Sequence, residues 1–260
     1  MMKKYVILFL ITQLVACGPQ NLKLDKQTTI TNKKKKLLMI GNSFTFYWNL
    51  PQILEMMFEY NGFDISVDQK TIGGTNLKNH WNNHLFNDYN FDRYDYVVLN
   101  EYSTYPLLKT DTAAKYFKLF NELAKNNNTK TYVYGTWEYP YLKKLSTNKN
   151  SNTMLKLDSI ANLLKATYVP VGDAISIIEE KHPEFDLYMD DEKHPSPNTS
   201  YLIACIFYSM ITGESPIGLP VRFQGKNIEG KKIYYVITEP KCVEISQSIA
   251  NYITMDKRKN

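Results

Sequence analysis

The sequence predicts an α/β protein, a three-layer α/β/α sandwich around a mostly parallel sheet. Two observations support this prediction. Short apolar runs alternate along the chain with longer segments whose apolar residues recur at helical spacing. Strands and helices that alternate in this way pair in parallel, with helices covering both faces of the sheet. The 260 residues are enough for one sizeable core and too few for two large domains.

The expected elements follow one another in a regular order. Strands are expected over 37–40, 63–72, 94–99, 131–134 and 168–171. Helices are expected over 50–60, 77–86, 112–125, 153–164 and 239–253. A further helix is expected to open at Pro197, with Ser196 as its cap. The polar stretch 142–152 is expected to be a loop, and 216–232 an irregular excursion.

The amino-terminus has the pattern of a secretory signal. Two lysines precede an apolar stretch over 5–11, and Ala16 stands directly before Cys17. The apolar stretch is too short for a transmembrane helix, which needs about 20 residues. The four residues that end at Cys17, Leu-Val-Ala-Cys, resemble a bacterial lipobox. That resemblance implies a signal peptide over 1–16 and lipidation of Cys17; a simple secretory signal is the alternative.

The residues after Cys17 predict an anchored domain. Residues 17–36 are polar and lack apolar periodicity, as expected of a tether between a membrane and a folded domain over 37–256. Gly18 follows the cysteine, which by the usual rule for such lipoproteins favours the outer membrane. We therefore expect an exported protein, lipid-anchored to the outer membrane and facing either the periplasm or the surface.

Charge and composition exclude some partners and leave others open. The formal net charge is +5, and two of these charges belong to the predicted signal peptide. The basic runs 33–36 and 257–259 lack interleaved aromatic residues, so no nucleic-acid binding is expected. The twenty tyrosines suit either a sugar-binding surface or a tyrosine-rich core. Export would permit a disulfide between Cys205 and Cys242, although the apolar surroundings of Cys205 favour free thiols.

Candidate catalytic residues come directly after expected strands or near the end of the α/β region. In open α/β sheets, functional groups gather at the carboxyl ends of the strands. Ser43 lies in the turn after the first strand, while Asp191 and His194 lie three residues apart in a late loop. A serine hydroxyl becomes a nucleophile when a neighbouring base, itself oriented by a third group, accepts its proton. These three residues are the candidate nucleophile, orienter and base.

Four blocks together resemble the SGNH (GDSL-like) hydrolase family, in a branch found among bacterial lipoproteins. They are Gly-Asn-Ser at 41–43, the glycine pair at 73–74, the amide Asn100, and Asp-x-x-His-Pro-Ser at 191–196. The resemblance spans residues 37–220 and implies a flavodoxin-like central sheet, a serine esterase and no cofactor. No Gly-x-Ser-x-Gly motif occurs, which disfavours the α/β-hydrolase fold.

The resemblance also implies a role for each matched residue. Ser43 would attack the ester, His194 would take its proton, and Asp191 would orient the imidazole. The oxyanion would be bound by the backbone N–H groups of Ser43 and Gly74 and by the side-chain amide of Asn100, with Gly73 as the alternative glycine. The third block departs from the family, because Leu-Asn-Glu at 99–101 replaces Gly-x-Asn-Asp.

The function expected from these residues is hydrolysis of a carboxylic ester. The resemblance to the family favours O-deacetylation of an extracytoplasmic glycan as the particular reaction. The expected partner is an acylated small molecule or glycan. The alternatives are a lipase or thioesterase with the same site, and a non-catalytic glycan-binding lipoprotein.

The remaining histidines and aromatic residues give weaker signals. His80 and His84 lie four residues apart, but no HExxH motif or cysteine accompanies them. We expect them to be surface or groove residues and expect no metal site. Several aromatic residues follow the blocks or strand ends and could line a cleft or pack in the core: Trp48, Trp81, Tyr102, Tyr105 and Trp137.

Overall fold

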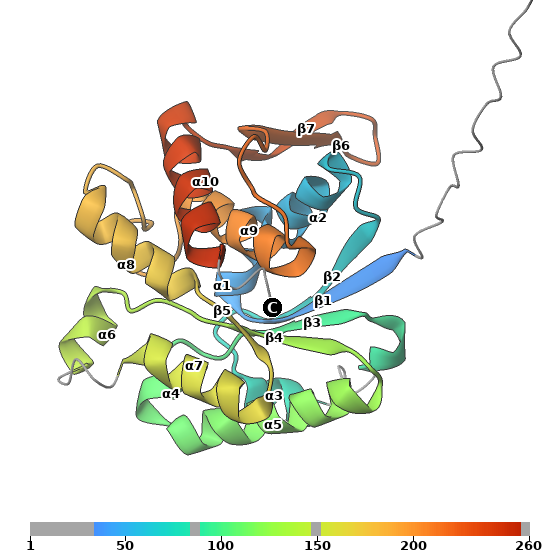
Figure 1. Cartoon of the computed structure of the whole chain (residues 1–260), viewed down its shortest axis with the longest axis vertical. Helices are drawn as coiled ribbons and strands as arrows, with labels where there is room; N and C mark the ends of the chain where they lie inside the picture. Colours follow the sequence, from blue (N-terminus) through green and yellow to red (C-terminus); the bar gives the residue numbers. More distant parts are fainter. Residues whose placement is uncertain (1–33, 84–88, 147–151, 256–260) are drawn as a thin grey trace, which may run out of the picture. The chain divides into compact units, whose positions relative to one another are not determined.

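The computed structural model describes residues 34–83, 89–146 and 152–255. Its centre is a parallel sheet with the strand order β2-β1-β3-β4-β5, a flavodoxin-like order (Figure 1). The strands are β1 (Lys35–Gly41), β2 (Ile65–Thr71), β3 (Tyr96–Leu99), β4 (Lys130–Tyr134) and β5 (Thr167–Val169). The predicted fold class is therefore confirmed. The predicted signal peptide, Cys17 and most of the predicted tether lie outside the described residues.

Helices cover both faces of this sheet (Figure 1). One face carries α2 (Leu50–Tyr60), α8 (Val171–Lys181), α9 (Pro197–Thr212) and α10 (Pro240–Thr254). The other carries α3 (Leu77–Asn82), α4 (Tyr105–Leu108), α5 (Thr110–Asn126) and α7 (Thr153–Leu164). Short helical turns connect the layers: α1 (Ser43–Phe46), η1 (Tyr47–Asn49), η2 (Phe91–Arg93) and α6 (Pro140–Leu145).

Strand β1 shows how the sequence specifies two cores. Leu37 and Met39 pack into the core beneath α2 and α9, whereas Leu38 and Ile40 pack into the core on the opposite face. All four side chains are fully buried. A parallel strand that is covered on both faces reads as a continuous apolar run, as this one does. The strand begins at Lys35, two residues before the expected start, because the backbones of both preceding lysines also pair with β2.

Helix α9 begins and ends as its sequence dictates. The Ser196 hydroxyl accepts a hydrogen bond from Thr199 N at 3.1 Å, and Pro197 occupies the first turn. The helix ends at Gly213, whose φ of 81° suits a residue without a side chain. Within the described residues, no helix is long and apolar enough to cross a membrane.

Both cysteines of the described domain are buried free thiols. Cys205 lies on α9 and Cys242 on α10, and no disulfide joins them. Burial raises the pKa of the Cys205 thiol above its ordinary value, so this thiol stays protonated.

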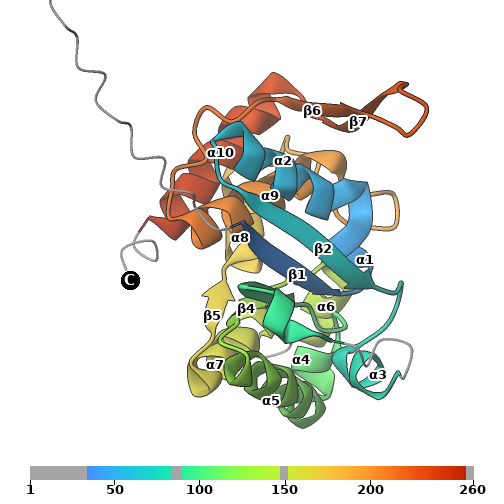
Figure 2. The same ribbon diagram turned by 90° about the vertical axis from the view of Figure 1, so that its right-hand side faces the viewer.

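Several segments differ from expectation. Residues 142–145, expected to belong to a loop, form the end of α6. Val171, expected at the end of a strand, begins α8, a helix that the sequence pattern did not predict. The segment 216–232, expected to be irregular, includes β6 (Arg222–Lys226), which forms an antiparallel hairpin with the following β7 (Lys232–Ile237) (Figure 2). Its turn is closed by Asn227, whose Oδ1 accepts the N–H groups of Glu229 and Lys231 at 3.1 and 2.8 Å. A turn closed by local side-chain hydrogen bonds cannot be predicted from apolar periodicity, because its stability does not depend on apolar residues.

Candidate active site

Asn42 joins the three loops that follow the central strands. Its Oδ1 accepts a hydrogen bond from Phe44 N at 3.1 Å and so caps α1. Its Nδ2 donates to Thr75 O at 3.2 Å and to Glu101 O at 3.1 Å. Gly41 precedes it without a side chain because a Cβ there would lie 2.6 Å from the Cβ of Asn100. The loops after β1, β2 and β3 are thereby held together at the carboxyl edge of the sheet.

The structure brings Ser43, His194 and Asp191 together. His194 Nε2 lies 2.8 Å from Ser43 Oγ, and His194 Nδ1 is hydrogen-bonded to Asp191 Oδ2. The other oxygen of Asp191 accepts the backbone N–H groups of Lys193 at 3.0 Å and His194 at 2.9 Å. A hydroxyl, an imidazole and a carboxylate in this sequence of contacts form the arrangement that activates a serine nucleophile.

Aromatic side chains position the His194 ring. Tyr47 stacks on the imidazole with ring centroids 4.4 Å apart, and Phe44 meets it edge-on at 5.7 Å. Trp137 stacks on Phe44 at 4.2 Å and donates from Nε1 to Lys193 O at 3.2 Å. The loop that carries His194 is therefore fixed through both its backbone and its side chains.

Asp191 is held in its ionised form. Partial burial by itself would raise the pKa of this carboxyl group, but the hydrogen bonds from His194 and from two backbone N–H groups outweigh that effect and lower the pKa. An ionised carboxylate at this position accepts a hydrogen bond from His194 Nδ1–H, which leaves the Nε2 lone pair free to accept a proton from Ser43.

A small pocket of about 110 Å³ opens beside the Ser43 hydroxyl. Its walls come from the loops after β1, β2 and β3 and from the late loop: Asn42, Ser43, Phe44, Gly74, Tyr102, Ser103, Lys193 and His194. Gly74 has a φ of 67°. Within the described residues, no protein group accepts the backbone N–H of Ser43 or of Gly74. Two N–H donors therefore remain available beside the serine, as an oxyanion would require.

Asn100 does not contribute to this pocket, which contradicts the expected third oxyanion donor. Its side chain is fully buried, and Oδ1 accepts hydrogen bonds from Asn42 N at 3.3 Å and Thr45 Oγ1 at 3.0 Å. Its Nδ2 donates to Glu101 O at 3.2 Å. Asn100 directly follows the last residue of β3, and its side chain points beneath the turn that carries Ser43. The residues of the loop after β3 that line the pocket are Tyr102 and Ser103.

Glu101 is a buried carboxyl group that the sequence analysis did not identify. It is 2% exposed, and its Oε1 accepts Tyr102 N at 2.7 Å and Leu77 N at 3.1 Å. It thus ties the loop after β3 to the start of α3. Its Oε2 is buried and has no hydrogen-bond partner. Burial raises the pKa of Glu101 from 4.5 to about 7, although the two backbone hydrogen bonds oppose this shift.

The raised pKa of Glu101 predicts a pH-dependent stability. The folded protein holds this proton more tightly than the unfolded chain, so the free energy of unfolding should fall as the pH rises from about 4.5 to about 7 and then level off. A shift of this size corresponds to roughly 3 kcal/mol. The Glu101→Gln variant keeps an oxygen for both N–H groups and should lack this slope in urea unfolding. An exposed control, Glu180→Gln, should keep it; parallel curves for wild type and Glu101→Gln would contradict the assignment.

His80 is a core residue, which corrects the expected surface or groove position. It is fully buried, and its Nε2 donates to Gly41 O at 2.8 Å. Burial lowers the pKa of His80, so the ring is neutral. His84 lies outside the described residues. In the described part of the chain, no group of three or more His, Cys, Asp or Glu side chains could hold a metal ion.

The aromatic residues singled out from the sequence divide between core and pocket. Tyr102 lines the pocket beside Ser43. Trp137 is fully buried beneath that pocket, and Trp81 packs edge-on against Phe120 at 5.1 Å. Trp48 is 38% exposed and donates from Nε1 to Pro195 O at 2.8 Å, so it braces the loop that carries His194.

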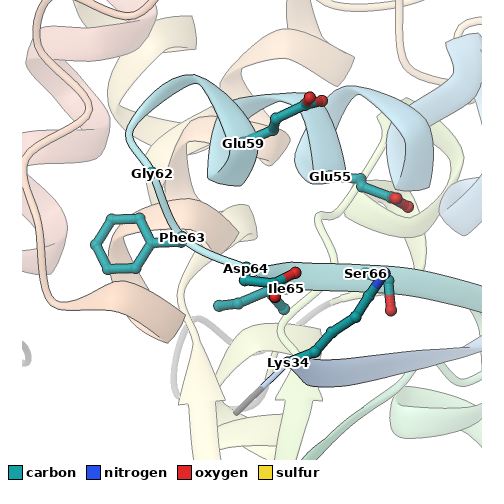
Figure 3. Close-up of a pocket in the computed structure, with 8 residues that line it drawn as sticks. All are labelled: Lys34, Glu55, Glu59, Gly62, Phe63, Asp64, Ile65 and Ser66. Atoms are coloured by element: carbon teal, nitrogen blue, oxygen red, sulfur yellow. The ribbon is translucent and has the colours of Figure 1, made fainter. Parts of the chain in front are cut away.

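A second cavity, of about 390 Å³, lies at the opposite edge of the sheet. Its walls include Glu55 and Glu59 of α2, Asp64 before β2 and Lys34 before β1 (Figure 3). This is the amino-terminal end of parallel strands whose carboxyl ends carry Ser43. The cavity holds none of the catalytic candidates, so the smaller pocket beside Ser43 is the candidate active site.

The chain has the fold of an SGNH-type hydrolase. It is similar to the solved structure of a candidate SGNH hydrolase from Slackia heliotrinireducens, at 25% identity over 67% of this chain and 97% of that one, with a TM-score of 0.57. A DUF4886 family protein from Bacteroides uniformis matches at 18% identity over 86% and 96% of the two chains, with a TM-score of 0.65. A variant of an acetyl-xylooligosaccharide esterase from Geobacillus matches at 17% identity over 69% and 95%, with a TM-score of 0.55. No family model matches the sequence, and no curated protein does.

Proposed function

We propose that the protein is a serine esterase that hydrolyses carboxylic esters through Ser43, His194 and Asp191. The observation that carries this proposal is the 2.8 Å contact between Ser43 Oγ and His194 Nε2, made by an imidazole whose Nδ1 is hydrogen-bonded to Asp191. The contact lies at the wall of a pocket with two available backbone N–H donors.

The reaction follows from these positions. His194 Nε2 takes the hydroxyl proton as Ser43 Oγ attacks the ester carbonyl, and the N–H groups of Ser43 and Gly74 stabilise the oxyanion. His194 then protonates the departing alcohol, which leaves the acyl group on Ser43. A water molecule, deprotonated by His194, releases the acid in a second attack and returns the serine to its starting state.

The pocket volume supports a small acyl group. A cavity of about 110 Å³ beside Ser43 suits an acetyl group better than a long acyl chain. One of the solved structures with this fold is an acetyl-xylooligosaccharide esterase. Together with the predicted export and the predicted lipid anchor at Cys17, these observations support O-deacetylation of an extracytoplasmic glycan at the outer membrane.

The test uses the full-length protein in detergent with a fluorophosphonate probe and with acetylated xylooligosaccharides. We expect the probe to label Ser43, located by peptide mass, and acetate to be released from the sugars. Release of long-chain acids from p-nitrophenyl esters without acetate release would favour a lipase or thioesterase. A protein that binds glycans but is neither labelled nor active on any ester would be a non-catalytic lipoprotein.

A further inference from the structure

Lys193 contributes a cationic side chain to the wall of the same pocket. It stands between the orienter and the base in the sequence. Its N–H donates to Asp191 Oδ1 at 3.0 Å, and its carbonyl accepts from Trp137 Nε1 at 3.2 Å. The groups that hold His194 in place therefore also fix the backbone from which the Lys193 side chain extends.

Three aromatic rings surround the Lys193 ammonium group. Its Nζ lies 5.9 Å from the centroid of Phe44, 5.5 Å from that of Tyr102 and 5.4 Å from that of Tyr139. Ring faces attract a cation and keep it in position, but they leave its positive charge in place. The Lys193 residue is half-buried. Neighbouring apolar rings lower the local dielectric, which strengthens the interaction of an ammonium group with an anion.

No carboxylate neutralises this charge within the described residues, where Lys193 takes part in no ion pair. Asp191 precedes Lys193 by two residues in the same loop. Both of its carboxylate oxygens already accept hydrogen bonds, from His194 and from backbone N–H groups. The positive charge at the pocket wall is therefore available to a bound molecule.

We propose that Lys193 forms an anion subsite beside the ester, and that the natural substrate is an acylated glycan with a carboxylate group, of the uronic-acid type, near the acylated hydroxyl. This inference rests on the proposed esterase function. The carboxylate would lie against Lys193 Nζ while the sugar faces the rings of Tyr102 and Tyr139, which offer apolar faces with polar edges. An ammonium group that pairs with a substrate carboxylate favours the acidic substrate over its neutral counterpart.

The test compares two acetyl esters that differ in one charge, 3-acetoxybenzoate and its methyl ester, with the full-length protein. Lys193→Met removes the charge and keeps a flexible apolar chain among the rings. We expect the ratio of kcat/KM for the anionic ester to that for the neutral ester to fall at least about tenfold in Lys193→Met. The kcat/KM for the neutral ester should fall by much less than that for the anionic ester, because the neutral ester has no carboxylate to pair with Lys193.

Two further variants make the result specific. Lys193→Arg keeps the charge and should keep most of the preference for the anionic ester. Lys115→Met removes a lysine that lies 5.6 Å from the Tyr116 ring on α5, outside the pocket, and should change neither ester. Added salt should lower the anionic preference of the wild type more than that of Lys193→Met.

The outcomes separate this inference from the function on which it rests. Equal losses on both esters in Lys193→Met would show that Lys193 stabilises the reaction and does not select an anion, which overturns the subsite. An unchanged ratio would also overturn it while the esterase function stands. If the wild type hydrolyses neither ester and a fluorophosphonate probe does not label Ser43, the esterase function and the subsite fail together.

Discussion

Replacing Ser43 with alanine is expected to lower kcat/KM for p-nitrophenyl acetate by on the order of 10⁴-fold or more. The substitution removes the only hydroxyl that lies at 2.8 Å from His194 Nε2 in the described structure. Loss of one partly exposed hydrogen bond should cost the fold about 1 kcal/mol or less, so thermal unfolding should change little. Steady-state kinetics and a melting curve of the two proteins measure both effects.

Ser103→Ala is the matched control for this experiment. Ser103 lines the same pocket and is buried, but its hydroxyl contacts Tyr139 OH at 3.3 Å and does not contact His194. Its loss should leave activity within about tenfold of the wild type. Activity that survives in Ser43→Ala but disappears in Ser103→Ala would mean that the nucleophile has been assigned to the wrong serine.

Replacing Asp191 with asparagine is expected to lower kcat by on the order of 10³- to 10⁴-fold. The carboxylate accepts hydrogen bonds from His194 Nδ1–H and from two backbone N–H groups, and these bonds lower its pKa. An amide presents a donor or only one acceptor in the same place, so the imidazole loses both its tautomer and the charge that stabilises it when protonated. The rates should be compared at neutral pH, where the wild-type carboxylate is ionised.

Asp190→Asn separates the role of this particular carboxylate from a general loss of negative charge. Asp190 is the exposed neighbour of Asp191 and should tolerate the change with full activity. If Asp191→Asn kept wild-type activity, the His194 ring would have to be oriented by other groups, such as the stacked Tyr47. The carboxylate would then lose its place in the catalytic arrangement.

Much of the fold was determined by local sequence patterns. Apolar periodicity predicted α2 and α7 with the bounds that the structure shows, since each presents one continuous apolar stripe to the sheet. The cap at Ser196 and the proline after it specified the start of α9 by bonds within one turn. Asp191 and His194 are three residues apart, so their contact also needs little beyond the local chain.

Local patterns were enough to predict features that depend on near neighbours: the alternation of strands and helices, several helix ends and the order of the four blocks. The orientation of side chains toward the pocket depends on the packing of separate segments. Asn100 lies beneath the Ser43 turn because its side chain is hydrogen-bonded to Asn42 and Thr45 in the loop after β1. Glu101 and His80 are also hydrogen-bonded to residues far away in the chain, Leu77 and Gly41. Lys193 reaches the pocket because rings from three separate segments surround its ammonium group. Such orientations depend on contacts between residues far apart in the chain, and apolar periodicity in one segment carries no information about them.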